Sequence, residues 1–396
     1  MSDRISILQQ DLRSGGAERM MLNLAREWTS RGIATDLVLV QRSGVYLPLV
    51  PPQVRVVDLG AGRTSACLPR LVRYLWKERP RALLSGLVHV NVAAILGRML
   101  GPRGVRLVIS ERNTPSQDSK DPERATRIGY RLAPYLYRYA DAITAVSAGV
   151  ADDLARFARL PRERIQVINN PVVTPELYEL AREPVSHPWF RPDSPPVILA
   201  VGRLSEAKDY PLLLRAFAHV RRTMTCRLLV LGDGPLQAEL EQLAESLGIR
   251  ADVDFAGFVL NPYSAMSHAA LLVLSSRWEG SPNVLVEAMA CGLPVVSTDC
   301  PSGPREILME GRYGALTPVG DIPALAQAIC STLANPPRSD VLRARAAAYA
   351  VSNAADCYLK ALLGSATAEG PGDLGEARTD METPSRNARQ RYAAAK

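Results

Sequence analysis

The stretch from residue 271 to residue 294 constrains the possible folds of this chain more than any other part of it. An uninterrupted apolar run, Leu271–Leu274, is typical of a strand buried on both faces of a parallel sheet. Ser281 and Pro282 then predict the start of a helix, which ends near Gly292. A strand followed by a short loop and a helix leaves the first amides of that helix unpaired, and such amides bind anions. The sequence therefore predicts an α/β protein with an anion-binding loop.

The residues around this helix start predict a ligand-facing element. We expect unpaired backbone amides at Asn283, Val284 and Leu285. Two acids flank them, Glu279 in the loop and Glu287 on the helix, and the rest of the helix is almost uncharged. Both acids are therefore expected to face a buried ligand.

The segment from Glu279 to Pro294, Glu-Gly-Ser-Pro-Asn-Val-Leu-Val-Glu-Ala-Met-Ala-Cys-Gly-Leu-Pro, resembles the Glu-x7-Glu signature of retaining glycosyltransferases of family 4. The likeness is to the bacterial polysaccharide and lipid-linked oligosaccharide type, and it extends over residues 1–363. It implies the α/β GT-B fold, in which two Rossmann-like domains face each other across a cleft and C-terminal helices cross back to the N-terminal domain.

The same resemblance implies a reaction. A hexose or N-acetylhexosamine would pass, with retention of anomeric configuration, from a nucleotide diphosphate sugar, with a UDP-sugar favoured. The acceptor would be a glycan or a polyprenyl-diphosphate-linked glycan, and neither a metal nor another cofactor is expected.

The domain organisation follows from alternating strand-like and helix-like stretches, a proline-rich passage and a polar C-terminal tail. The predicted segments are an N-terminal Rossmann-like acceptor domain (1–170), a linker (171–196), a C-terminal Rossmann-like nucleotide-sugar domain (197–340), helices packing back on the N-terminal domain (341–363) and a disordered tail (364–396).

Two cations follow the first strand of the second domain. Arg203 offers a planar fork of donors and Lys208 a point charge, and both suit phosphate oxygens. Their Gly-Arg-Leu…Lys-Asp pattern also resembles the family. Gly232 in a glycine turn resembles the nucleotide-facing turn, and Phe258 lies in the segment that resembles the base-side one.

Three N-terminal motifs face the cleft in the family that the chain resembles: Gly15-Gly16 at a helix start, His89 with Asn91 after a strand, and Glu111-Arg112 after the next strand. The resemblance implies that His89 faces the donor sugar and that Asn91, Glu111 and Arg112 line the acceptor side.

The resulting site assignment is as follows. Catalysis is expected to depend on Glu279, His89, Arg203 and Lys208, with Glu279 accepting hydrogen bonds from the donor sugar and Glu287 from the ribose. The donor-binding residues are expected to be Gly15, Gly16, Arg203, Lys208, Gly232, Phe258, Glu279, Gly280, Ser281, Asn283, Val284, Leu285 and Glu287.

Composition bears on the location of the protein. Residues 1–190 hold 27 Lys and Arg against 18 Asp and Glu, whereas residues 191–396 hold 20 against 22. The basic half suits anionic lipid head groups, a diphosphate-bearing acceptor or nucleic acid, unless it reflects only a basic-rich proteome. Of these partners, nucleic acid is not expected. The six cysteines lack Cys-x-x-Cys spacing, and no apolar run is long enough for a membrane span. We therefore expect a cytoplasmic protein, with the inner face of the cytoplasmic membrane as a candidate site of action.

Two basic, aromatic-bearing stretches leave alternatives open. Residues 68–79 predict an amphipathic helix whose apolar side includes Trp76 and whose other side carries Arg70, Arg73 and Lys77. That helix either packs on the sheet or rests on a membrane. The Arg- and Tyr-rich stretch 127–139 allows either core tyrosines with arginines reaching to solvent, or a surface for a membrane interface or a single-stranded nucleic acid.

Two other functions fit the same motifs. A nucleotide-sugar epimerase of GT-B fold would act without an acceptor, and a non-catalytic nucleotide-sugar-binding protein would need no catalytic groups. The Asp252-Val253-Asp254 sequence is interpreted as strand-associated, not as a metal site.

Overall fold

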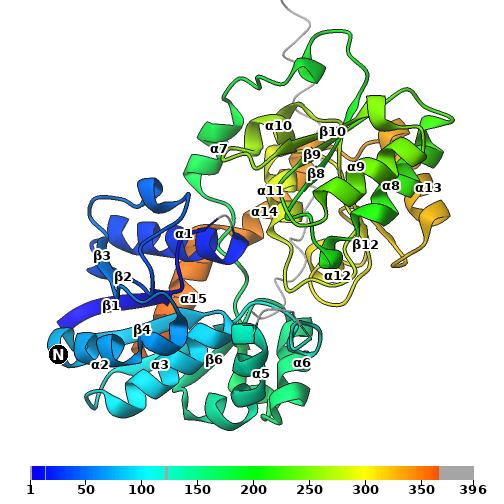
Figure 1. Cartoon of the computed structure of the whole chain (residues 1–396). Coiled ribbons are helices and arrows are strands. Elements are labelled where there is room, and N and C mark those ends of the chain that lie inside the picture. Colours follow the sequence, from blue (N-terminus) through cyan, green and yellow to red (C-terminus); the bar gives the residue numbers. More distant parts are fainter. Residues whose placement is uncertain (1, 14, 121–123, 365–396) are drawn as a thin grey trace, which may run out of the picture. The chain divides into compact units, whose positions relative to one another are not determined.

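The computed structural model of the chain describes residues 2–13, 15–120 and 124–364. These residues form two parallel β-sheets with helices packed around them (Figure 1). The predicted α/β class is therefore confirmed. The predicted disordered tail, apart from Gly364, lies outside the described residues.

The first sheet has seven strands among the described residues, in the order β3-β2-β1-β4-β5-β6-β7, and every pairing is parallel. The strands are β1 (Ser2–Gln9), β2 (Thr35–Leu39), β3 (Arg55–Asp58), β4 (Pro80–Gly86), β5 (Arg106–Glu111), β6 (Ala142–Ala145) and β7 (Ile165–Val167). The helices of this part are α1 (Gly16–Ser30), α2 (Leu68–Glu78), α3 (Val88–Leu100), α4 (Pro115–Asp118), α5 (Arg124–Leu136) and α6 (Ala148–Ala158).

The second sheet has six strands in the described part of the chain, again all parallel, in the order β10-β9-β8-β11-β12-β13. The strands are β8 (Val197–Val201), β9 (Arg227–Leu231), β10 (Val253–Gly257), β11 (Leu271–Leu274), β12 (Val295–Thr298) and β13 (Ala315–Thr317). The helices that follow β7 are α7 (Pro175–Ala181), α8 (Tyr210–Arg221), α9 (Gln237–Ser246), α10 (Tyr263–His268), α11 (Asn283–Cys291), α12 (Pro304–Ile307), α13 (Ile322–Ala334), α14 (Ser339–Ala346) and α15 (Val351–Leu363).

Burial on both faces explains the composition of the central strands. Every residue of β2, β11 and β12 is buried, as expected for parallel strands covered by helices on both sides. The order of strands reverses beside β1 in the first sheet and beside β8 in the second. Loops at the carboxyl ends of strands beside such reversals form ligand crevices in open α/β sheets. The fold therefore brings Arg203 and the loop after β11 to one such edge.

The segment predicted as a linker contains a packed helix. The side chain of Thr174 accepts a hydrogen bond from the Leu177 amide, and Pro175 occupies the first turn of α7. Leu177 is buried, and α7 packs against α10 and α11. The proline-rich passage 171–196 therefore contains both a helix, which starts at Pro175, and irregular connections.

The two final helices pack on different parts of the chain. α15 lies against α1, β4 and β5, as predicted for helices that cross back (Figure 1). α14 instead packs on α11, where Leu342 is buried in the core of the second sheet. The prediction that this whole segment packs on the N-terminal domain is therefore wrong for α14.

Helix α2 packs on the first sheet through Leu71, Tyr74 and Leu75. The predicted apolar stripe included Trp76, but this side chain is 49% exposed, and its indole N–H donates to the Leu100 carbonyl at 3.1 Å. The helix therefore presents an aromatic ring beside its basic residues. Within the residues described, no helix combines the length and apolar character that a bilayer span requires.

The docking of α15 can be tested with two neighbouring leucines. Leu362 is fully buried, whereas Leu363 is 38% exposed. Leu362→Ala should lower the free energy of unfolding by about 2–5 kcal/mol because it leaves a cavity. Leu363→Ala should change it by about 0.5 kcal/mol or less. Urea denaturation of both variants measures the difference, and equal losses would contradict the packing of α15 on the first sheet.

Candidate functional site

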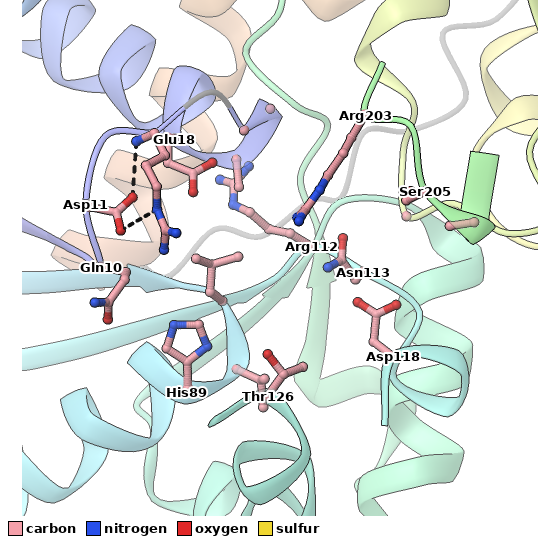
Figure 2. Close-up of a pocket in the computed structure, with 18 of the residues that line it drawn as sticks. Gln10, Asp11, Glu18, His89, Arg112, Asn113, Asp118, Thr126, Arg203 and Ser205 are labelled. Carbon is pink, nitrogen blue, oxygen red and sulfur yellow. Dashed lines mark hydrogen bonds and ion pairs between the residues drawn. The ribbon is translucent and has the colours of Figure 1, made fainter. Parts of the chain in front are cut away.

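A cleft of about 2760 Å³ is lined by loops from both sheets. Figure 2 shows side chains from both parts of the chain around it, with Glu18, His89 and Arg112 from the first part and Arg203 from the second. Most of the residues predicted from the sequence line this cleft: Gly15, Gly16, His89, Glu111, Arg112, Arg203, Lys208, Gly232, Phe258, Glu279, Gly280, Ser281, Asn283, Val284 and Glu287.

The start of α11 lies one residue later than predicted. Pro282, in an extended conformation with ψ of 98°, occupies the position before the helix, and Asn283 is the first helical residue. The Leu285 amide donates to the Pro282 carbonyl at 3.2 Å. The amides of Asn283 and Val284 donate to no other described residue and remain available to a ligand.

Glu279 and Lys208 form an ion pair inside the cleft. The Lys208 Nζ lies 2.5 Å from the Glu279 Oε1, and the Ser276 hydroxyl donates to the same oxygen at 2.6 Å. The Glu279 side chain is only 10% exposed. The structure therefore brings the predicted phosphate-binding lysine to the loop that precedes α11.

Arg203 reaches the cleft from the loop after β8. Its side chain is exposed and extends towards Arg112 on the opposite side (Figure 2). None of the ion pairs among the described residues involves Arg203. Its guanidinium is thus open to an anionic ligand.

Glu287 is buried beside two residues that the site assignment did not include. The Tyr263 hydroxyl donates to the Glu287 Oε1 at 3.1 Å, and the Arg19 guanidinium lies over the Tyr263 ring, 4.9 Å from its centroid. Burial raises the pKa of Glu287, while Arg19 and the Tyr263 hydrogen bond oppose that rise. Arg19 stands in the Gly-Gly-Ala-Glu-Arg segment, so the sequence contained a signal for it.

Two glycine positions have no room for a side chain. A Cβ on Gly280 would meet the Arg112 carbonyl oxygen at 1.9 Å. Gly232 has a φ of 145°, and a Cβ there would meet the Gly202 carbonyl oxygen at 2.1 Å. Both glycines therefore allow backbone segments to approach each other at the wall of the cleft.

The helix start at Gly15 and Gly16 lies next to α11. A Cβ on Gly16 would stand 3.2 Å from the Asn283 side-chain amide nitrogen. The Glu18 side chain folds back over Gly15, and burial raises the pKa of Glu18. Glu18, together with Gln10 and Asp11, adds acidic and amide groups to this wall (Figure 2).

Residues that follow strands of the first sheet hold the loop between β11 and α11 in place. The Thr114 hydroxyl donates to the Glu279 carbonyl at 2.6 Å, and the Ser147 hydroxyl donates to the Gly280 carbonyl at 2.7 Å. The Asn170 amide donates to the Asn283 Oδ1 at 2.7 Å. Asn170 in turn accepts a hydrogen bond from Arg112 at 3.0 Å. Arg112 therefore supports the start of α11 through Asn170 besides lining the cleft.

Two predicted residues do not reach the cleft surface. Asn91 is fully buried and accepts a hydrogen bond from the Ser85 hydroxyl while donating to the Ser110 carbonyl and the Tyr137 hydroxyl. It joins β4 and β5 to α3 and is not exposed on the acceptor side. Leu285 has its side chain in the hydrophobic core and its amide already bonded.

His89 lies on the first turn of α3 and lines the cleft (Figure 2). The preceding Leu87 has a φ of +80°, which is strained for a residue with a side chain. This turn starts α3 immediately after β4 and brings His89 to the carboxyl edge of the sheet.

The described residues contain no cluster of three or more His, Cys, Asp or Glu side chains suited to a metal ion. Asp252 accepts a hydrogen bond from Arg221, and Asp254 contacts His187 at 2.9 Å. Asp252 is therefore paired with Arg221, and Asp254 with the His187 ring.

The fold and the cleft define a two-domain GT-B-type protein. Residues 14–176 match the family model described as Glycosyltransferase Family 4, and residues 195–335 match the model described as Glycosyl transferases group 1. The chain belongs to glycosyltransferase family 4.

Two curated relatives show partial matches. The chain is 31% identical over 243 residues to an enzyme of Campylobacter jejuni named N-acetylgalactosamine-N,N'-diacetylbacillosaminyl-diphospho-undecaprenol 4-alpha-N-acetylgalactosaminyltransferase, a match covering 61% of this chain and 64% of that enzyme. It is 30% identical over 231 residues to an uncharacterized glycosyltransferase of Methanocaldococcus jannaschii, covering 54% of this chain and 56% of the relative. The matches thus span less than two thirds of the length of either relative.

A solved structure supports the fold. The Anabaena protein HepE in complex with UDP and glucose superposes with a TM-score of 0.73 at 20% identity, covering 92% of this chain and 100% of that one.

Glu111 predicts a measurable pH dependence of stability. It is buried and accepts hydrogen bonds from the Tyr130 and Tyr137 hydroxyls, and burial raises its pKa from 4.5 to about 7. Between these two pH values the folded state keeps a proton that the unfolded chain releases. The contribution of Glu111 to the unfolding free energy is therefore fully present below pH 4.5 and is lost as the pH rises through about 7. Relative to Glu111→Gln, the wild-type unfolding free energy should fall by at most about 3 kcal/mol across this window. Urea denaturation of both proteins at several pH values measures this difference in unfolding free energy. Parallel pH profiles for the wild type and Glu111→Gln would contradict the raised pKa of Glu111.

Proposed function

We propose that the protein transfers a hexose or N-acetylhexosamine from a nucleotide diphosphate sugar to a glycan or lipid-linked acceptor, with retention of anomeric configuration. UDP is the favoured nucleotide. One observation carries the proposal: Lys208 lies against the loop of Glu279, directly before the two unpaired amides of α11.

The main physical problem of this reaction is the charge on the leaving nucleoside diphosphate. Arg203, Lys208 and the amides of Asn283 and Val284 supply positive charge and hydrogen-bond donors on one side of the cleft. These groups suit a diphosphate without a metal ion, and we propose that the reaction is metal-independent.

The ion pair between Lys208 and Glu279 compensates the charges of both side chains in the cleft. A lone buried charge would be costly, and each partner compensates the other. When the donor binds, Lys208 can turn to a phosphate oxygen while Glu279 accepts hydrogen bonds from sugar hydroxyls. We propose that the bond between the anomeric carbon and the diphosphate oxygen then breaks, and that the acceptor hydroxyl oxygen bonds to that carbon on the same face. The departing nucleoside diphosphate takes the acceptor proton on a phosphate oxygen.

The relatives support the substrate classes. The name of the Campylobacter enzyme describes a diphospho-undecaprenol-linked acceptor, and HepE was solved with UDP and glucose. We infer a similar nucleotide sugar here, and an acceptor that enters from the side of His89 and Arg112. Release of UDP only when an acceptor is present would separate this activity from an epimerase or a binding protein.

Replacing Lys208 tests the proposal. Lys208→Ala should lower turnover roughly 100-fold or more, because the departing diphosphate loses a charged donor. The matched control Lys360→Ala removes an exposed lysine of α15 that lies outside the cleft, and it should keep wild-type turnover. Both variants should retain the wild-type circular dichroism spectrum. Unchanged turnover in a folded Lys208→Ala protein would overturn the phosphate assignment.

We also propose that the protein works at the cytoplasmic face of a membrane. Arg73 and Lys77 on α2 are exposed beside Trp76, and Met99 and Leu100 are 52% and 59% exposed. Aromatic and apolar groups beside cations suit an anionic lipid interface.

Vesicle flotation measures this contact. The double change Arg73→Gln and Lys77→Gln should weaken binding to vesicles containing phosphatidylglycerol roughly tenfold. The same change at Arg156 of α6 and at Arg182, which directly follows α7, should have a smaller effect; these side chains are 76% and 74% exposed. Equal losses in both pairs, or no binding by the wild type, would contradict a contact at α2.

A further inference from the structure

We propose that Arg19 of α1 is a positioning residue for the nucleotide: it orders Tyr263 and, through it, keeps the Glu287 carboxylate ready to accept hydrogen bonds from the ribose hydroxyls. This inference rests on the proposed function, because it assumes that a nucleotide ribose binds at Glu287.

The geometry places Arg19 between aromatic rings contributed by separate parts of the chain. Its guanidinium carbon lies 4.9 Å from the centroid of the Tyr263 ring and 5.5 Å from that of the Tyr46 ring. Its Nη2 donates to the Leu260 carbonyl at 3.3 Å. Two ring faces and one carbonyl therefore contact the same guanidinium, whose planar, multi-donor shape a lysine ammonium does not have.

Tyr263 transmits this order to the carboxylate. Its ring face contacts Arg19, while its hydroxyl donates to the Glu287 Oε1 at 3.1 Å. No ion pair within 4.0 Å joins Arg19 directly to Glu287, so Arg19 acts on the carboxylate through space and through the tyrosine.

The charge state of Glu287 matters for binding. An ionised carboxylate offers acceptors on both oxygens, so it can accept from two ribose hydroxyls, whereas a protonated one turns one oxygen into a donor. Glu287 is 7% exposed, and burial favours the protonated form. Arg19 and Tyr263 oppose this effect of burial. Arg19 of α1 is therefore the cation that favours the ionised form of the Glu287 carboxylate.

The three residues Arg19, Tyr263 and Glu287 come from both halves of the chain. Arg19 belongs to a helix that packs on the first sheet, whereas Tyr263 and Glu287 lie on α10 and α11 beside the second. Gly16 lies against Asn283 at the same junction. The ribose site is therefore complete only with α1 in contact with α10 and α11, which adds a role for the N-terminal half in nucleotide binding.

Calorimetric titration with UDP and with 2',3'-dideoxy-UDP, which lacks both ribose hydroxyls, tests the inference. The wild type should bind UDP at least about tenfold more tightly than the dideoxy nucleotide. Arg19→Gln should reduce this preference to about threefold or less, with little change in affinity for the dideoxy nucleotide. Glu287→Gln should do the same, and the double variant should show no further loss.

The control is Arg26→Gln on the same helix, where Arg26 donates to the Leu49 carbonyl and pairs with Glu176 outside the cleft. It should keep the wild-type preference for UDP. Thermal unfolding monitors folding of each variant.

The outcomes separate this inference from the proposed function. A folded Arg19→Gln protein that keeps the preference, or that binds both nucleotides more weakly by the same factor, overturns the role of Arg19 while the proposed function stands. A wild type that does not distinguish the two nucleotides, or binds neither, overturns the ribose assignment of Glu287 itself.

Discussion

The site depends on how the loop between β11 and α11 is held. Lys208 neutralises Glu279 from the side of the second sheet, and hydrogen bonds from Thr114, Ser147 and Asn170 fix the loop from the side of the first. The Glu279 and Gly280 carbonyls and the Asn283 side chain accept these hydrogen bonds, so the loop and the first amides of α11 are held together at the wall of the cleft. The anion-binding character of the helix start is thus supported by both halves of the chain.

This arrangement links fold to chemistry. Parallel strands leave their carboxyl ends at one edge of each sheet, and both edges contribute to one cleft. In the proposed reaction, Arg203 and Lys208 contact the departing diphosphate, and Glu279 and Glu287 on either side of the helix start accept hydrogen bonds from sugar and ribose hydroxyls. Family membership is consistent with this division, since one family model matches each half of the chain.

Sequence reasoning succeeded where the signal was local. The run Leu271–Leu274 is β11 itself, and Gly292 ends α11 with a positive φ as predicted. The predicted start of α11 is wrong by one residue. Ser281 was expected to precede the helix, but Pro282 has an extended ψ and takes that position. Asn91 was predicted on the acceptor side because it follows a strand end, but its side chain is buried and bonded to Ser85, Ser110 and Tyr137.

What the sequence could not reveal are pairings between distant segments. Arg19 and Tyr263, or Asn170 and Asn283, are far apart along the chain, and no periodicity or spacing records their contact. The role of Arg112 as a support for Asn170 was hidden for the same reason.

A crystal structure with bound UDP tests the central claim most directly. The account predicts diphosphate oxygens within hydrogen-bond reach of Arg203, Lys208 and the first amides of α11; a diphosphate bound away from all three would contradict it.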